Sequence, residues 1–226
     1  MDQGLNNDFS KRVVIHSEDA EWQASPSPSV WRKRLDLAGD AEASRVTSVV
    51  RYDPKSHFHS HPHPGGEEIL VLAGVFSDEH GDYPAGSYLL NPEGFSHAPF
   101  SNDGCVLFVK LRQYPGLGRT KLIVDTSTRP FPEESDSGLQ MMPLYAEAAF
   151  PERVDLVRLA PGAALPAGDH PGGAEVFILA GELTADDGEH GKGAWLRYPA
   201  GRRPALTSNQ GCRFYLKRDH LPTASP

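Results

Sequence analysis

The chain has 226 residues and a net charge of −8, with 38% hydrophobic and 23% charged residues, which suits one large soluble domain or two small ones. Basic residues cluster only in WRKR at 31–34, expected as a solvent-exposed strand edge or turn, and at Arg202–Arg203, which argues against nucleic acid as a partner. Without an apolar signal-peptide core or a run of roughly 18 apolar residues, we expect a cytoplasmic protein with no membrane partner, in which Cys105 and Cys212 are buried structural thiols.

Short apolar runs alternate with glycine- and proline-containing turn signals along the whole chain, which predicts an all-β fold of many short strands. Because no long segment holds a 3.6-residue apolar period, helix should be scarce. A proline- and serine-rich surface connector is expected at 22–30, and a hairpin turn near 79–82. In the first half, strands are expected at 12–16, 46–52, 67–74, 86–92 and 105–113.

An internal repeat appears when the sequence is shifted by 107 residues. HPGGEEILVLAG at 63–74 then aligns with HPGGAEVFILAG at 170–181, and the alignment continues without a gap to position 110. This similarity predicts two copies of one all-β unit. We place the two domains at 1–115 and 116–226, each beginning with a strand, VVI in the first and LIV in the second.

A histidine-rich stretch, HFHSHPH at 57–63, precedes a glycine pair and a glutamate. Alternate side chains of an extended chain share one face, and neutral imidazole is the commonest metal ligand in proteins. Two blocks stand out, His61-x-His63-x-x-x-Glu67 and the downstream PEGFSH that ends at His97. Since a metal site needs ligands that converge from different strands, we predict that His61, His63, Glu67 and His97 form one.

The neighbouring polar residues are assigned to other positions. His57 and His59 either extend the site at its mouth or are exposed to solvent. Glu68 should point to the opposite face from Glu67, as a structural or surface charge, and His80 should lie in the hairpin turn at the surface.

The two blocks, in this order and at this spacing, resemble the two sequence motifs of the cupin superfamily. Residues 45–113 are similar to the cupin domain of the ChrR family, and the repeat extends the cupin resemblance over nearly the whole chain. The resemblance implies two tandem cupin barrels, which are RmlC-like jelly rolls. It also implies one divalent metal ion, Zn or Fe, with Mn or Ni as alternatives, held by His61, His63, Glu67 and His97.

Two functions follow from this resemblance. The first is a metal-dependent oxygenase that acts on a small diketone or aromatic ketone, as in the related acetylacetone-cleaving dioxygenase-like proteins. The second is a non-catalytic, zinc-binding sensor or regulatory cupin of ChrR type, and a metal-free ligand-binding barrel is a third reading. The chain lacks the helical module with His and CxxC ligands that precedes the cupin domain of the anti-sigma factor, which argues against a sigma-factor partner. A small molecule is the expected partner, a homodimer is compatible with the family, and the sequence identifies no catalytic residue.

The second copy keeps only one of the four predicted ligands. His63 aligns with His170, whereas the other three positions hold Gly168, Ala174 and Pro204. We therefore expect the second domain to bind no metal. An anion pocket built from Arg202–Arg203 is the alternative function for this domain, against the simpler reading that both arginines face solvent.

Overall fold

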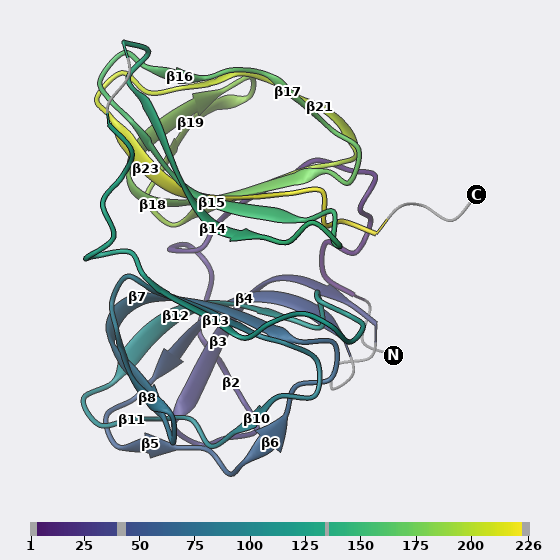
Figure 1. Cartoon of the computed structure of the whole chain (residues 1–226), viewed down its shortest axis with the longest axis vertical. Helices are drawn as coiled ribbons and strands as arrows, with labels where there is room; N and C mark the ends of the chain where they lie inside the picture. The colour runs from purple at the N-terminus through teal and green to yellow at the C-terminus, as the bar shows by residue number, and fades with distance from the viewer. Residues whose placement is uncertain (1–3, 40–43, 134–135, 223–226) are drawn as a thin grey trace. The chain divides into compact units, whose positions relative to one another are not determined.

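The structure is a computed structural model that describes residues 4–39, 44–133 and 136–222 (Figure 1). The described residues form strands, turns and loops, which confirms the expected all-β class. None of them belongs to a helix long and apolar enough to cross a membrane. Two compact units are present: unit 1 comprises 1–7 and 20–130, and unit 2 comprises 8–19 and 131–226.

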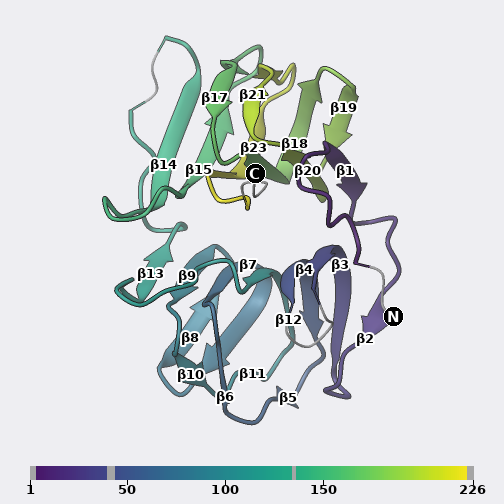
Figure 2. The ribbon, with the colours of Figure 1, turned by 90° about the vertical axis from the view of Figure 1, so that its right-hand side faces the viewer.

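Unit 1 is built on a sheet in which β7 is central, in the order β13-β9-β7-β12-β4-β3-β2. Figure 2 shows β9, β7, β12, β4 and β3 side by side in this sheet. The long strand β7 continues beyond this sheet at its far end, where it pairs with β8 and β11 in a second sheet that also includes β5. The strands are β2 (Gln23–Ala24), β3 (Val30–Ala38), β4 (Arg45–Tyr52), β5 (Ser56–His57), β6 (His61–Pro62), β7 (Glu67–Asp78), β8 (Gly81–Pro84), β9 (Ser87–Asn91), β10 (Ser96–His97), β11 (Phe100–Ser101), β12 (Cys105–Leu111) and β13 (Leu122–Asp125).

Unit 2 repeats this arrangement around β18, in the order β1-β20-β18-β23-β15-β14. Its interior is a continuous apolar core that includes Val157, Ile178, Leu196 and Phe214. Its strands are β1 (Val13–His16), β14 (Leu139–Ala146), β15 (Arg153–Leu159), β16 (Ala164–Leu165), β17 (Gly168–His170), β18 (Ala174–Ala185), β19 (Gly188–Gly191), β20 (Ala194–Tyr198), β21 (Gly201–Arg203), β22 (Leu206–Thr207) and β23 (Cys212–Arg218).

The first strand of each sequence repeat lies in the other unit, which differs from the expected assignment. Strand β1 pairs with β20, so that Val14 lies opposite Leu196 in unit 2. Strand β13 pairs with β9, so that Ile123 lies opposite Leu89 in unit 1. An added strand satisfies the unpaired backbone groups of a sheet edge, and the self-alignment could not show which edge each strand covers.

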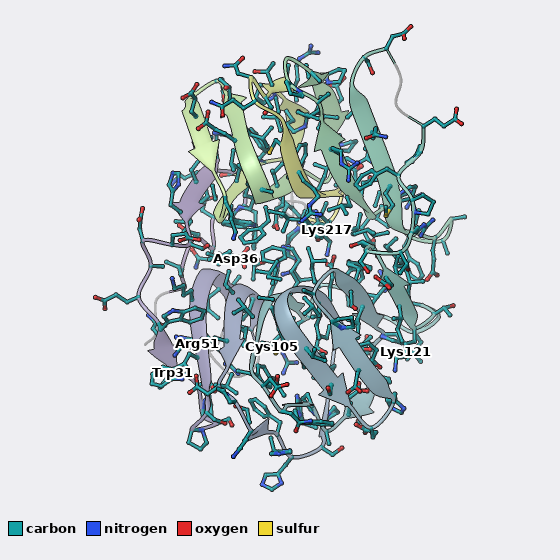
Figure 3. The ribbon with its side chains drawn as sticks, turned by 90° about the vertical axis from the view of Figure 1, so that its left-hand side faces the viewer. Trp31, Asp36, Arg51, Cys105, Lys121 and Lys217 are labelled. Carbon is teal, nitrogen blue, oxygen red and sulfur yellow. The ribbon has the colours of Figure 1, made fainter. Side chains whose placement is uncertain are left out.

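The segment WRKR was predicted as an exposed strand edge or turn; it lies in β3, a strand next to the edge of the sheet, and is half-buried rather than exposed. Residues 31–34 pair with β4 on one side, and Trp31 and Arg32 also pair with β2 on the other. Trp31 pairs with Arg51 of β4, and Figure 3 shows these two side chains close together. The alternate residues Arg32 and Arg34 line the interior cavity described below.

Candidate metal centre and cavity

Three of the predicted ligands converge at one end of the unit 1 barrel. A short ribbon of β6 and β10 places His61 directly opposite His97. The backbone N–H of His63 donates to the carbonyl of Phe95 at 2.8 Å, which ties the first histidine block to the second. The ligand atoms of His61, His63 and His97 all lie within 4.8 Å of one another, a cluster that could hold a metal ion.

The distances within the cluster suit a single ion. His63 Nε2 and His97 Nε2 are 2.9 Å apart, and Glu67 Oε2 lies 3.4 Å from the first and 3.5 Å from the second. Ligand atoms bound at about 2.1 Å to one ion, at right or tetrahedral angles, are separated by about 3.0–3.4 Å. These three donor atoms therefore stand at separations that an ion can bridge.

Hydrogen bonds at Nδ1 orient two of the imidazoles. His61 Nδ1 donates to the carbonyl of His59 at 2.9 Å, and His97 Nδ1 donates to Asp78 Oδ2 at 3.0 Å. With the proton held on Nδ1, the lone pair of each ring is on Nε2 and is available to a metal. Burial and the neighbouring His61 lower the pKa of His63 to about 3, so its ring is neutral at pH 7.

Glu67 begins β7 and is buried, with Oε2 accepting a hydrogen bond from Asn91 Nδ2 at 3.0 Å. Burial raises the pKa of this carboxyl group. The preceding glycines Gly65 and Gly66 have φ values of 69° and 73°, as expected for a chain that turns sharply between ligands. A Cβ atom on Gly66 would lie 2.9 Å from the Cβ of Tyr114, so a larger residue does not fit there.

A cavity of about 710 Å³ adjoins the cluster inside the unit 1 barrel. His61, His63 and Glu67 form part of its wall. Its other walls combine apolar residues of the central strands, such as Val50 and Leu107, with polar and charged side chains. This volume is within the range of small-molecule sites.

Some histidines and glutamates near the cluster lie outside it. His57 and His59 are exposed and line the cavity, in agreement with a place at its mouth. Glu68 is buried on the other face of β7 and accepts hydrogen bonds from Tyr88 at 3.0 Å and Tyr114 at 2.7 Å, so its role is structural. His80 is exposed in the turn between β7 and β8, as predicted.

Asp78 is the site residue that the sequence did not reveal. It ends β7, and its carboxylate accepts hydrogen bonds from His97 Nδ1 and from the backbone N–H of His80. Burial alone would raise the pKa of Asp78, but these hydrogen bonds outweigh burial and lower it. In the sequence, Asp78 could have been recognised as the first acidic residue of SDEHGD at 77–82, because it lies where the strand ends.

Unit 2 offers a different arrangement at the equivalent positions. A Cβ atom on Gly168 would lie 2.8 Å from His170 Nε2, so the ring of His170 fills the space that a second histidine would need. Among the described residues, the only cluster of three potential metal ligands is the one in unit 1. Arg203 is buried and donates to the carbonyl of Pro166 at 2.6 Å, whereas Arg202 is exposed, so the two arginines do not share a pocket.

Both cysteines are free and buried, as expected. Burial raises the pKa of Cys105 to about 11 and that of Cys212 to about 12. Neither thiol belongs to the histidine cluster.

Comparison with known proteins identifies a family whose members resemble both halves of the chain. The family model described as the ChrR cupin-like domain matches residues 10–115 and again residues 119–222. A search of curated proteins gave no match.

Solved structures share the fold at low sequence identity. A presumed dioxygenase from Nostoc punctiforme has a TM-score of 0.74 and 14% identity, covering 96% of this chain and 88% of that one. The pirin YhhW of Escherichia coli, in complex with nickel(II), has a TM-score of 0.69 and 11% identity, covering 95% of this chain and 100% of that one. An oxalate decarboxylase of Lactobacillus farciminis, in complex with formate, has a TM-score of 0.63 and 14% identity, covering 94% and 87%. The expected tandem jelly rolls are thereby confirmed.

Proposed function

Since the chain belongs to the ChrR cupin-like family, we propose that unit 1 holds one divalent metal ion and acts as an oxygenase on a small diketone or related ketone. The ligands in this proposal are His61, His63, His97 and Glu67. The observation that supports it is the convergence of their donor atoms beside a cavity of about 710 Å³. A purely structural metal site is closed by its ligands, whereas a catalytic site keeps a position open to substrate.

A bound ion would act as a Lewis acid toward a substrate oxygen, and an N/O ligand set can hold Fe(II) as well as Mn, Ni or Zn. The surrounding residues supply the remaining functions. Asp78 fixes the ring of His97 through Nδ1. Glu67 Oε2 faces the imidazoles and would be held by the ion, so it could accept a proton from a carbon acid in the cavity only when it leaves the ion. Val50 and Leu107 provide an apolar part of the cavity wall against which the carbon skeleton of a substrate can pack.

Oxygen consumption tests this function. Protein loaded with Fe(II) is expected to take up O₂ in the presence of at least one member of a panel of 2,4-diketones and aryl ketones. The uptake should be lost in His61→Ala and kept in His170→Ala, which alters the equivalent histidine of unit 2. Iron-loaded protein that consumes no O₂ with any compound would contradict the oxygenase proposal. Stable zinc occupancy without turnover would instead support the regulatory cupin.

A further inference from the structure

The cavity of unit 1 is lined by cations as well as by the histidine cluster. Arg32, Arg34 and Arg112 are among its lining residues. Glu67 is the only acidic side chain among the described residues that line it. The cavity lining therefore carries more positive than negative side chains, although the whole chain has a net charge of −8. Such a cavity favours an anionic ligand.

Two of these arginines enter the cavity from β3. The strand alternates, so Val30, Arg32 and Arg34 line the cavity, while Trp31 packs beside Arg51 on the other face (Figure 3). Within the described residues, the Arg34 guanidinium is held by a neutral group, since Nη1 donates to Gln23 Oε1 at 2.9 Å. This contact orients the side chain without neutralising its charge.

The internal repeat shows that the barrel does not need these arginines. Arg32 pairs with Val50 and Arg34 with Ser48, next to a bulge in β3. At the same register and beside the same bulge, β14 of unit 2 carries Met141 and Pro143. These two arginine positions are therefore uncharged in unit 2, where the described residues also form no histidine cluster.

At the end of the cavity near the histidine cluster, Arg112 can likewise be compared with its equivalent in unit 2. It follows β12 with a φ of 57°, and its N–H donates to the carbonyl of Gly66 at 2.9 Å, close to the histidine cluster. The equivalent Asp219 has a φ of 58° and accepts a hydrogen bond from the N–H of Gly172 at 3.0 Å. Aspartate suits this left-handed backbone better than arginine does. The backbone alone thus does not explain the arginine in unit 1.

The two ends of the cavity are separated by the width of a small molecule. Strand β3 lies three steps from β7 in the order β7-β12-β4-β3. The pairing register places Arg34 opposite Ser48, Ser48 opposite Val109, and Val109 opposite Ile69 of β7. At about 4.8 Å per step, the backbone of Arg34 is roughly 14 Å along the sheet from that of Ile69, which lies two residues after Glu67. Side chains from both ends shorten this gap.

We propose that the substrate is a small carboxylate, with its anionic group bound by Arg32 and Arg34 and its carbonyl end directed toward the histidine cluster, beside Arg112. Guanidinium groups bind carboxylates through paired, charge-assisted hydrogen bonds. The placement of the carbonyl end rests on the proposed metal-dependent function. The binding of the carboxylate does not, because the arginines are present with or without a metal.

Titration calorimetry with a matched pair of probes tests this inference. The acid is 4,6-dioxoheptanoate, a β-diketone that carries a carboxylate, and the control is its neutral primary amide. Wild-type protein is expected to bind the acid about 10- to 100-fold more tightly than the amide. Arg32→Gln/Arg34→Gln should lower the affinity for the acid far more than that for the amide, and so abolish this preference, while the metal content stays the same. Arg51→Gln, on the outer face of the neighbouring strand, should keep the preference.

Equal affinity for acid and amide in wild-type protein, no detectable binding of the acid, or an unchanged preference in the double variant would overturn the inference. Displacement of the acid by an equal concentration of inorganic phosphate would overturn the assignment to a carboxylate. The wild-type comparison decides the matter even if the double variant does not fold. Repeating it on metal-free protein separates the two proposals, because the preference for the acid should persist there even if the metal site proves wrong.

Discussion

The imidazole of His97 is held through both of its nitrogen atoms. Nδ1 donates to the buried carboxylate of Asp78, and Nε2 faces His63 and Glu67. A carboxylate behind a metal-binding histidine fixes the ring and its tautomer and makes Nε2 a stronger ligand. The site therefore depends on a residue that does not itself face the proposed ion.

Replacing Asp78 tests this dependence. Asp78→Asn is expected to weaken metal binding about 10- to 100-fold, because the neutral amide no longer holds the His97 proton as an ionised carboxylate does. Competition with a chromophoric chelator measures the affinity. Asp82→Asn, an exposed carboxylate in the same hairpin, serves as the control and should bind like wild type. Equal affinities in both variants would show that Asp78 does not support the site.

The two thiols give a pH-dependent prediction. Burial raises the pKa of Cys105 to about 11, so at pH 8 only about one molecule in a thousand carries a thiolate. Native protein should resist iodoacetamide at pH 8, and protein unfolded in guanidinium chloride should be alkylated at both cysteines, as mass spectrometry can record. Rapid alkylation of the native protein would contradict the burial of these side chains.

The same pKa shift has a consequence for stability. A thiol whose pKa is raised by folding contributes stability below its unfolded pKa, and that contribution is lost as the pH rises through the folded value. For Cys105 the loss should extend from the ordinary thiol pKa of 9.0 to about 11.

The site residues differed in how far the sequence could identify them. His61, His63, Glu67 and His97 could be named as candidate ligands because fixed spacing joins them into two blocks. Asp78 has no such spacing, since it contacts His97 across a separation of 19 residues, from β7 to β10, and these two strands do not pair with each other. A tertiary contact of this kind leaves no periodic pattern in the chain.

Strand β3 shows a similar limit at the level of an element. Its inward residues alternate as Val30, Arg32 and Arg34, so charges occupy the face that pattern analysis expects to be apolar. Residues 31–34 were therefore predicted to be a solvent-exposed strand edge or turn, whereas they are half-buried. In contrast, the strands at 46–52 and 105–113 were predicted close to β4 and β12, because their apolar residues dominate both runs.

Strand β1 belongs to the first sequence repeat, but it lies in unit 2 and contributes to the stability of that unit. Val14 packs against the apolar core of unit 2, and β1 covers the edge of β20. Val14→Asp should destabilise unit 2 by about 1–3 kcal/mol, since it buries an unpaired charge at a partly buried position. Lys11→Ala, an exposed residue of the same segment, is the control.

Denaturant unfolding followed by circular dichroism measures the effect of Val14→Asp. Metal binding by unit 1 should remain, because the substitution lies in the other unit. Unfolding curves of Val14→Asp that coincide with those of Lys11→Ala would show that β1 does not contribute to the stability of unit 2.

The same fold occurs in both units of the chain, so the two units can be compared with each other. Both units keep the long central strand, with the same order of neighbouring strands around it. Among the described residues, only those of unit 1 combine a histidine cluster with the arginine-lined cavity described above. Sequence repetition predicted the shared fold, and differences at aligned positions predicted that the two copies have different roles. The exchange of β1 and β13 could not be predicted, because the aligned sequences are the same whichever sheet edge each strand covers.

Metal stoichiometry tests the central claim most directly. Elemental analysis of protein purified without added metal, and then loaded and desalted, should give one divalent ion per chain in wild type and in His170→Ala. The double variant His61→Ala/His97→Ala should retain none, provided that its circular dichroism spectrum shows it to be folded. Equal metal content in the double variant and in wild type would contradict the account.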